Sequence, residues 1–210
     1  MLRILIADDH PIVRQGLKQI LSEESDMGVS GEAQNSQEVL KLVQKQDWDI
    51  VILDITMPGR GGIDVLKELK HQYPKLPLLI LSMHPEDQYA VRALKAGAGG
   101  YLTKESAQEE LIKAIRKIVR GGKYISSTLA EKLAFDLETE TEKPLHETLS
   151  DREHQVLLMI ASGKTVSEIA EELSLSVKTI DTYRARILEK MKMKTNAELM
   201  HYAIKNGLVD

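Results

Sequence analysis

The sequence contains no cysteine, few aromatic residues and no long apolar run. Without cysteine, disulfides, thiolate nucleophiles and cysteine-based zinc sites are excluded. No apolar run approaches the roughly 20 residues of a membrane span. The N-terminal apolar segment leads directly into Asp8 and Asp9, so we expect no signal peptide, no membrane partner and a cytoplasmic location. The net charge of −4 argues against indiscriminate nucleic-acid binding, although it is compatible with a local basic patch.

Short apolar segments alternate with amphipathic ones up to about residue 120. We predict five strands, at residues 3–7, 28–33, 50–53, 78–81 and 99–102. We predict five helices, at residues 11–21, 36–45, 62–71, 86–96 and 107–120. Ser36 is the expected N-cap of the second helix. This alternation predicts an α/β fold, a doubly wound, five-stranded parallel sheet with helices on both faces.

The pattern changes near residue 136, where a polar, acidic segment to residue 148 is typical of a linker. Beyond it we predict four helices, at residues 151–162, 166–173, 177–191 and 196–206. Ser150 and Glu153 have the spacing of a capping box, and Ser176 is the expected N-cap of the third of these helices. We therefore predict three parts: an α/β domain at 1–121, a linker at 122–147, and a small all-α domain at 148–210.

Polar side chains follow four of the predicted strands, and the carboxyl ends of parallel strands are where open α/β sheets bind ligands. They are Asp8, Asp9, Asp54, Ser82 and Lys104. Clustered carboxylates repel one another, and a hard divalent cation such as Mg²⁺ relieves that repulsion. A carboxylate nucleophile, a metal, a hydroxyl and a lysine together suit phosphoryl transfer. Each residue alone fits a turn or a helix cap, but their joint occurrence at successive strand ends favours a site.

Residues 1–120 resemble the receiver domain of two-component response regulators. The segments that carry the resemblance are Asp8-Asp9, Asp54 with Met57-Pro58-Gly59, Ser82, Ala96-Gly97-Ala98 and Tyr101-Leu102-Thr103-Lys104. It implies that a histidine kinase phosphorylates Asp54. It also implies that Asp9, Asp54 and the Thr56 backbone carbonyl hold Mg²⁺ or Mn²⁺, with Asp8 binding through water.

The same resemblance implies that Ser82 and Lys104 contact the phosphoryl oxygens and that the rotamer of Tyr101 reports the phosphorylation state. Many receivers follow the lysine with a proline in a cis peptide bond, whereas Glu105 stands here. A cis bond before a residue other than proline costs roughly 2.5–4 kcal/mol. The geometry of this loop is therefore left open.

Residues 166–191 have the spacing of a helix-turn-helix, with the turn at 174–176 and Ala170 small enough for a close crossing. From Lys178 to Lys194 there are six basic residues and two acidic ones, in a chain that is acidic overall. A locally basic helix of this kind suits contact with the phosphate backbone of nucleic acid. A solvated basic face on a structural helix is the alternative.

Residues 146–210 resemble the LuxR-type DNA-binding domain, through residues 148–153, 166–170, 176–180 and 187–191. The resemblance implies that the third helix enters the major groove. The implied DNA contacts are Lys178, Thr179, Thr182, Arg184 and Arg186, with Lys190 and Lys194 at phosphates. Asp181 stands where many relatives carry lysine, so we expect a different base preference. The last helix is expected either to contact a second protomer or to place Leu199 and Ala203 in the core.

Together these features predict a bacterial response regulator of the NarL/FixJ type, a transcription factor switched by phosphorylation of Asp54. The switch is expected to act through dimerisation and release of the recognition helix. The expected partners are a cognate sensor histidine kinase, double-stranded promoter DNA and a second copy of the chain, with RNA polymerase as a further candidate. We expect no catalysis beyond self-phosphorylation from a phosphodonor and autodephosphorylation.

Three alternatives remain open. The first is a DNA-binding regulator that works without phosphorylation, which the complete set of acidic residues disfavours. The second is an aspartyl-phosphate phosphatase, which is disfavoured because Thr56 stands where such enzymes commonly place a second acid. The third is an output domain that binds RNA or protein.

Overall fold

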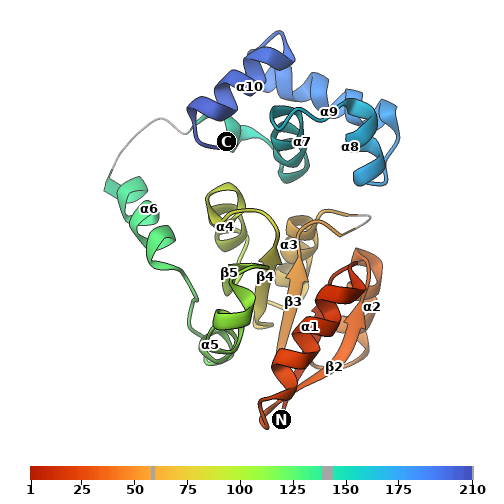
Figure 1. Ribbon diagram of the computed structural model, residues 1–210, viewed down its shortest axis with the longest axis vertical. Coiled ribbons are helices and arrows are strands. Elements are labelled where there is room, and N and C mark those ends of the chain that lie inside the picture. The colour runs from red at the N-terminus through yellow and green to blue at the C-terminus, as the bar shows by residue number, and fades with distance from the viewer. Residues whose placement is uncertain (58–59, 139–143, 210) are drawn as a thin grey trace. The chain divides into compact units, whose positions relative to one another are not determined.

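The computed structural model describes residues 1–57, 60–138 and 144–209 of the chain. It divides into two compact units, Met1–Glu138 and Thr139–Asp210, whose elements are labelled in Figure 1. Pro58 and Gly59 of the receiver-like motif lie outside the described residues, as does the middle of the predicted linker.

The first unit is built on a parallel sheet whose strands follow the apolar segments of the sequence. The strands are β1 Leu2–Ala7, β2 Met27–Ala33, β3 Ile50–Asp54, β4 Leu78–Ser82 and β5 Gly100–Thr103. Their order is β2-β1-β3-β4-β5, and every neighbouring pair is parallel. All residues of β3 and β4 are buried, as expected for strands covered on both faces. The predicted α/β class and doubly wound sheet are confirmed.

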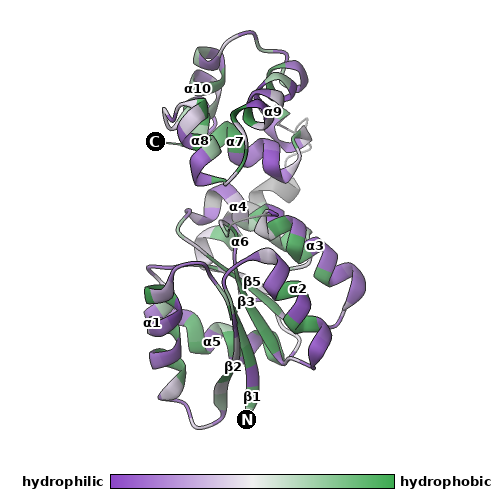
Figure 2. Ribbon diagram, turned by 90° about the vertical axis from the view of Figure 1, so that its right-hand side faces the viewer, coloured by the Kyte–Doolittle hydropathy of each residue, from purple (hydrophilic) through white to green (hydrophobic). Residues whose placement is uncertain are grey.

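Five amphipathic helices cover this sheet, α1 and α5 on one face and α2, α3 and α4 on the other (Figures 1 and 2). Their bounds are α1 Pro11–Ser22, α2 Ser36–Lys45, α3 Gly62–Gln72, α4 Glu86–Lys95 and α5 Ala107–Val119. In Figure 2 the central strand β3 is mostly hydrophobic, whereas the helices carry both hydrophobic and hydrophilic residues. The core beneath α1 and α5 includes Ile4, Leu17, Ile50, Leu79 and Leu111.

The start of α2 differs from the prediction, because Asn35 and not Ser36 is the N-cap. Asn35 is extended, with φ −157°, and its side-chain oxygen accepts the backbone N–H of Glu38 at 3.0 Å. Its amide nitrogen donates in return to the Glu38 carboxylate at 2.8 Å. Ser36 is buried instead, and its hydroxyl oxygen accepts the backbone N–H of Arg60 at 3.1 Å.

A helix that was not predicted from the sequence, α6 Ser127–Glu138, lies within the segment 122–147 assigned to the linker. The hydroxyl of Ser126 accepts the backbone N–H of Leu129 at 3.1 Å, as an N-cap does. Leu129 is buried, and α6 contacts α4. Only the last residues of α6 fall in the polar segment that begins near residue 136, and the helix is stabilised by its tertiary contact with α4.

The second unit is helical, with a short 3₁₀ turn η1 Leu145–Thr148 followed by the four predicted helices. They are α7 Asp151–Ala161, α8 Val166–Glu172, α9 Val177–Lys190 and α10 Asn196–Lys205. The Ser150–Glu153 capping box and the Ser176 N-cap are both present, as predicted. Leu199 and Ala203 are fully buried, which gives them a core role. Among the residues described in both units, no helix is long and apolar enough to cross a membrane.

Candidate functional site

Three carboxylates meet at the switch point of the sheet, where β1 and β3 are neighbours although β2 intervenes in the sequence. Asp8 and Asp9 follow β1, and Asp54 is the last residue of β3. A ligand atom from each, together with one from His10, lies within 4.8 Å of the others. Asp8 and Asp54 are each only 1% exposed. We call Asp8, Asp9 and Asp54 the acidic cluster.

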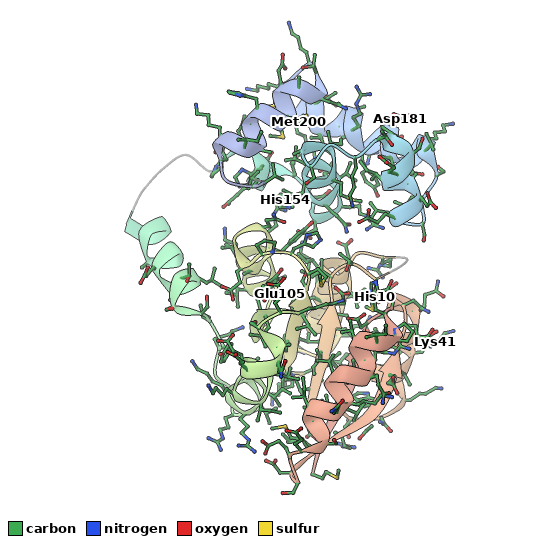
Figure 3. All side chains as sticks on the ribbon, viewed as in Figure 1. His10, Lys41, Glu105, His154, Asp181 and Met200 are labelled. Atoms are coloured by element: carbon green, nitrogen blue, oxygen red, sulfur yellow. The ribbon has the colours of Figure 1, made fainter. Side chains whose placement is uncertain are left out.

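Lys104, directly after β5, supplies a buried positive charge to this cluster. Its Nζ lies 2.7 Å from Asp8 Oδ2 and 2.8 Å from Asp54 Oδ2. Burial lowers the pKa of Lys104, but the charges of Asp54 and Asp8 and their hydrogen bonds outweigh burial, so the pKa rises above its ordinary value. The backbone N–H of Lys104 donates to the Ser82 carbonyl at 2.7 Å. The peptide bond to Glu105, labelled in Figure 3, is trans, which answers the question that the missing proline raised.

Thr56 holds the other oxygen of Asp54. Its backbone N–H and its hydroxyl donate to Asp54 Oδ1 at 3.0 and 2.9 Å. The resemblance assigned a role only to the Thr56 backbone carbonyl, so the side-chain contact was missed. An aspartate followed two residues later by a backbone or side-chain donor is typical of an Asx turn, and that spacing is the signal that would have indicated it.

Gly62, the first residue of α3, closes the turn that follows β3. A Cβ atom here would lie 2.5 Å from the Asp54 carbonyl oxygen and 2.5 Å from Ile55 Cα. Both obstacles are backbone atoms, so a side chain would push the acceptor strand and α3 apart.

Ser82 and Tyr101 both hold the backbone of His84, in the loop between β4 and α4. The Ser82 hydroxyl accepts the His84 N–H at 3.0 Å, and the Tyr101 hydroxyl donates to the His84 carbonyl at 2.8 Å. Ser82 is fully buried and Tyr101 is 1% exposed. The two residues that the resemblance linked to switching are therefore connected through one loop residue.

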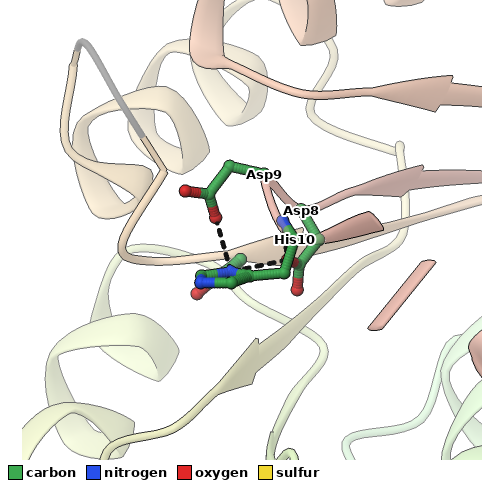
Figure 4. A group of neighbouring side chains, drawn as sticks. Asp8, Asp9 and His10 are labelled. Carbon is green, nitrogen blue, oxygen red and sulfur yellow. Dashed lines mark hydrogen bonds and ion pairs between the residues drawn. The ribbon is translucent and has the colours of Figure 1, made fainter. Parts of the chain in front are cut away.

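His10 faces the acidic cluster from the turn between β1 and α1, as Figure 4 shows. Its Nδ1 lies 2.8 Å from Asp9 Oδ1 and 3.3 Å from Asp8 Oδ1. Its backbone N–H also donates to Asp8 Oδ1 at 2.8 Å. His10 was not among the site residues predicted from the sequence. Its place directly after the paired acids was the available signal.

Arg14, on the buried face of α1, donates a hydrogen bond to the backbone of the acidic cluster. Its Nη1 donates to the Asp8 backbone carbonyl at 2.7 Å, and its Nε donates to Glu32 at 3.1 Å. It was also missed, although its helical spacing with Leu17 and Leu21 places it on the apolar face of α1.

The donor set of the acidic cluster fits a divalent cation. Asp8 Oδ2 and Asp9 Oδ1 are buried oxygen atoms. Among the described residues, Asp8 Oδ2 faces the Lys104 ammonium and Asp9 Oδ1 faces the His10 imidazole at ion-pair distance. Oxygen donors of this kind are the ligands that Mg²⁺ prefers.

In the second unit, α8 and α9 form the predicted helix-turn-helix. Thr165 and Glu168 make a capping box at the start of α8. Ser174, in the turn, adopts a left-handed backbone with φ 53°, and the Ser176 hydroxyl accepts the Thr179 N–H at 3.1 Å to begin α9. Ile180 is fully buried, which fixes the face that α9 turns inward.

Among the basic residues of α9, Lys178, Arg186 and Lys190 are exposed and Arg184 is half-buried. Arg184 and Lys190 are engaged within the unit: Arg184 Nε donates to Asn196 Oδ1 at 2.7 Å, and Lys190 Nζ lies 2.6 Å from the buried carboxylate of Glu153.

The remaining predicted DNA contacts lie near this helix. Thr179 is half-buried, and its hydroxyl is 2.7 Å from that of Ser176. Thr182 is exposed and donates to the Lys178 carbonyl at 2.9 Å. Lys194 is exposed in the loop before α10, and Asp181, labelled in Figure 3, is exposed on α9.

Comparison with known proteins finds one family match in each of the two units. Residues 4–116 match the family described as response regulator receiver domain, and residues 147–203 match the bacterial regulatory proteins of the luxR family. The chain is 36% identical to response regulator GacA of Pseudomonas aeruginosa over 211 residues, covering 100% of this chain and 99% of GacA. It is also 36% identical to response regulator UvrY of Escherichia coli over 209 residues, covering 99% of this chain and 96% of UvrY.

Among solved structures, RcsB of Salmonella enterica serovar Typhimurium, bound to promoter rprA with the phosphomimetic BeF₃⁻, is similar. The TM-score is 0.66 and the identity 29%, with 96% of this chain and 98% of that chain covered. An RcsB–DNA complex is similar with a TM-score of 0.60 and 28% identity over 100% of this chain and 99% of that one. The chain therefore belongs to the response regulators of the NarL/FixJ type, in which a receiver domain is followed by a LuxR-type DNA-binding domain.

Proposed function

We propose that Asp54 is the phosphoacceptor of this response regulator and that its donors are a cognate histidine kinase and small acyl phosphates. The observation that carries the proposal is the placement of Asp54 at the sheet switch point, with Lys104 Nζ 2.8 Å from its carboxylate. Phosphoryl transfer is catalysed largely by positioning and by cations that neutralise the phosphoryl oxygens. Lys104 is within reach of an oxygen on Asp54 and supplies one such cation.

In the transfer, a carboxylate oxygen of Asp54 attacks phosphorus and forms an acyl phosphate. The phosphorus–nitrogen bond of the kinase phosphohistidine breaks, and the imidazole leaves with the bonding electron pair and takes a proton from solvent. Lys104 then shifts from the carboxylate to the phosphoryl oxygens. The Ser82 hydroxyl, which accepts from His84, keeps its own proton to donate to them.

We further propose that the acidic cluster holds Mg²⁺ or Mn²⁺ through Asp9, Asp54 and the Thr56 backbone carbonyl, with Asp8 acting through water. When bound, the ion neutralises the negative charge of the transferring group. Three carboxylates converge here, and among the described residues one lysine ammonium, that of Lys104, lies at ion-pair distance from them, which supports this assignment.

The switch that follows is proposed to run through the His84 backbone. Phosphorylation replaces the single negative charge of the Asp54 carboxylate with a phosphoryl group that carries about −1.5 to −2 charge at neutral pH. Ser82 moves to the phosphoryl group, which alters its bond to the His84 N–H, and Tyr101 responds through its bond to the His84 carbonyl. The loop between β4 and α4 is then the element that has one conformation when Asp54 is phosphorylated and another when it is not.

The output is proposed to be binding to double-stranded promoter DNA by a homodimer, at half-sites about one helical turn apart. The DNA-contacting residues proposed are Lys178, Thr179, Thr182, Arg184 and Arg186, with Lys190 and Lys194 at phosphates. Among the first five residues, Lys178 and Arg186 have the most direct support, because both are exposed. The similar RcsB structure holds promoter DNA together with a phosphomimetic, which supports a phosphorylation-linked output.

We propose that dimerisation uses α10, whose Ile204 is 56% exposed although Leu199 and Ala203 belong to the core. RNA polymerase is a further proposed partner of the DNA-bound dimer. The domain limits at residues 121 and 148 stay predictions.

The test is phosphoryl incorporation and DNA binding with and without an acyl phosphate donor. We expect Asp54→Asn to abolish incorporation and the donor-stimulated gel shift, and Asp47→Asn, on an exposed residue, to change neither. Incorporation that persists in Asp54→Asn would overturn the acceptor assignment. Equal DNA binding by both proteins, with or without donor, would instead support a regulator that works without phosphorylation.

A further inference from the structure

His10 adds a nitrogen donor to a site whose other donors are oxygens. Its Nδ1 belongs to the group of ligand atoms, with Asp8, Asp9 and Asp54, that lie within 4.8 Å of one another. Figure 4 shows His10 beside Asp8 and Asp9. We propose that His10, Asp8 and Asp9 together bind a divalent transition-metal ion of the Zn²⁺ and Co²⁺ class, and bind it more tightly than Mg²⁺. This inference rests on the cation site of the proposed function: it shares Asp9, adds the His10 nitrogen and makes Asp8 a direct donor.

The separations between the donor atoms suit one shared ion. Nδ1 of His10 lies 2.8 Å from Asp9 Oδ1 and 3.3 Å from Asp8 Oδ1. Ligand bonds to Zn²⁺ measure roughly 2.0–2.2 Å, so neighbouring donors around it are about 2.9–3.5 Å apart, depending on the coordination angle. The two separations are close to that range, so a small rotation of the exposed imidazole brings the three donors onto one ion.

The backbone pre-positions the histidine for this role. His10 follows the paired acids directly, its N–H donates to Asp8 Oδ1 at 2.8 Å, and Pro11 starts α1 at the next residue. The proline restricts the backbone on one side, and the hydrogen bond restricts it on the other. The imidazole is 62% exposed, so an ion reaches it from solvent.

Lys104 does not compete for the same atoms. It contacts Oδ2 of Asp8 and Oδ2 of Asp54, whereas His10 faces Oδ1 of Asp8 and Oδ1 of Asp9. An ion bound at His10 therefore leaves the ion pair between Lys104 and Asp8 in place. The preference between ions follows from donor chemistry, because Mg²⁺ selects oxygen donors whereas imidazole suits Zn²⁺ and other late first-row ions.

The experiment compares the tag-free full chain with His10→Gln and with His71→Gln, which changes another exposed histidine. Calorimetric titration with Zn²⁺ and, separately, with Mg²⁺ measures both affinities. We expect wild type to bind Zn²⁺ more tightly than Mg²⁺, and His10→Gln to weaken Zn²⁺ binding by roughly tenfold or more while Mg²⁺ binding is retained. His71→Gln is expected to match wild type for both ions.

A spectroscopic measurement identifies the donor. Cu²⁺ bound to the chain, studied by pulsed electron paramagnetic resonance, is expected to show coupling to an imidazole nitrogen that His10→Gln removes and His71→Gln keeps. Asp9→Asn is a second variant, expected to weaken both Zn²⁺ and Mg²⁺ binding. Equal Zn²⁺ affinity in wild type and His10→Gln, or a nitrogen coupling that persists in His10→Gln, overturns the proposal.

The role of Asp54 as phosphoacceptor and the role of His10 as metal ligand can be refuted independently of each other. Phosphoryl incorporation from an acyl phosphate with Mg²⁺ is expected to persist in His10→Gln. If wild type incorporates phosphate but His10→Gln binds Zn²⁺ as wild type does, only the role of His10 is wrong. If wild type itself incorporates none at Asp54, the proposed function is wrong whatever the titrations show.

Discussion

Lys104 Nζ lies 2.8 Å from Asp54 Oδ2, joining the end of β5 to the end of β3 across the intervening β4. The same ammonium also contacts Asp8, so one buried cation offsets two buried carboxylates. Removing one partner of a buried ion pair leaves the other charge uncompensated, which is costly. The pair therefore contributes to the stability of the receiver domain as well as to its proposed chemistry.

Replacing Lys104 with methionine is expected to lower the free energy of unfolding of the receiver domain by about 3 kcal/mol near neutral pH. Added Mg²⁺ is expected to restore more stability to the variant than to wild type, because the ion takes over the lost positive charge. Urea unfolding with and without Mg²⁺ measures both effects. Equal stability of the two proteins without metal would contradict the prediction.

The pH dependence of this contribution follows from the raised pKa of Lys104. The ordinary pKa of lysine is 10.5, and the pKa of Lys104 is higher than this in the folded state. The stabilisation by the charge of Lys104 is therefore complete below the ordinary pKa and is lost as pH rises through the folded pKa. We therefore expect the stability difference between wild type and Lys104→Met to narrow from about pH 9 to about pH 11.5. Urea unfolding at both pH values measures it, and a constant difference would show that Lys104 does not act through its charge.

Gly62→Ala is expected to destabilise the chain by about 2 kcal/mol or more, because the new methyl group would clash with backbone atoms of Asp54 and Ile55. Gly16→Ala is the matched control. No atom outside its own helix lies within 4 Å of the position that the new methyl group would take, so this change in α1 is expected to stabilise by about 0.5–1 kcal/mol. Thermal unfolding compares the two, and effects of the same sign would refute the assignment of Gly62.

Lys190→Gln and Arg186→Gln are expected to differ in their effect on stability. Both residues are exposed, but Lys190 also pairs with the buried carboxylate of Glu153. Losing the pair is expected to cost about 1–2 kcal/mol of stability. Losing Arg186 is expected to leave stability unchanged and to weaken DNA binding, with a salt slope reduced by about one. Unfolding curves and gel shifts at several salt concentrations decide between these outcomes.

The stability that the Lys190–Glu153 ion pair contributes depends on pH in the acid range, which gives a second measurement. Burial raises the pKa of Glu153, but hydrogen bonds from Lys190 and Ser150 outweigh it and lower the pKa below its ordinary 4.5. The stabilisation by the Lys190–Glu153 ion pair is therefore present above about pH 5 and is lost as pH falls through the pKa of Glu153 in the folded state. The destabilisation by Lys190→Gln is expected to shrink at about pH 3, and one that persists there would exclude the ion pair as its cause.

Tyr101→Phe removes the hydroxyl that donates to the His84 carbonyl. The loss of one buried hydrogen bond is expected to cost about 1 kcal/mol of stability, because the carbonyl is left without this donor. If the loop between β4 and α4 carries the switch, the variant also loses part of the donor-stimulated DNA binding while phosphoryl incorporation at Asp54 persists. Stimulation equal to wild type would exclude this route.

The sequence alone determined the sheet, the helix-turn-helix and the members of the acidic cluster. Apolar runs such as residues 50–53 predict buried parallel strands, and in parallel sheets the residues after the strands meet at one edge whatever the loops do. Local signals of fixed spacing, such as Ser150 with Glu153, placed helix starts equally well. These features depend on period and neighbour spacing, which the sequence states directly.

Only the tertiary structure decided which side chains these residues meet. Lys190 was expected at DNA from its position on a basic helix, and only the structure shows that it also pairs with Glu153, 37 positions away. Arg14 likewise donates to Glu32, 18 positions away, and α6, in the predicted linker, is stabilised by contact with α4. Pairings between residues far apart in the chain depend on packing distances and on burial, and no local pattern records those.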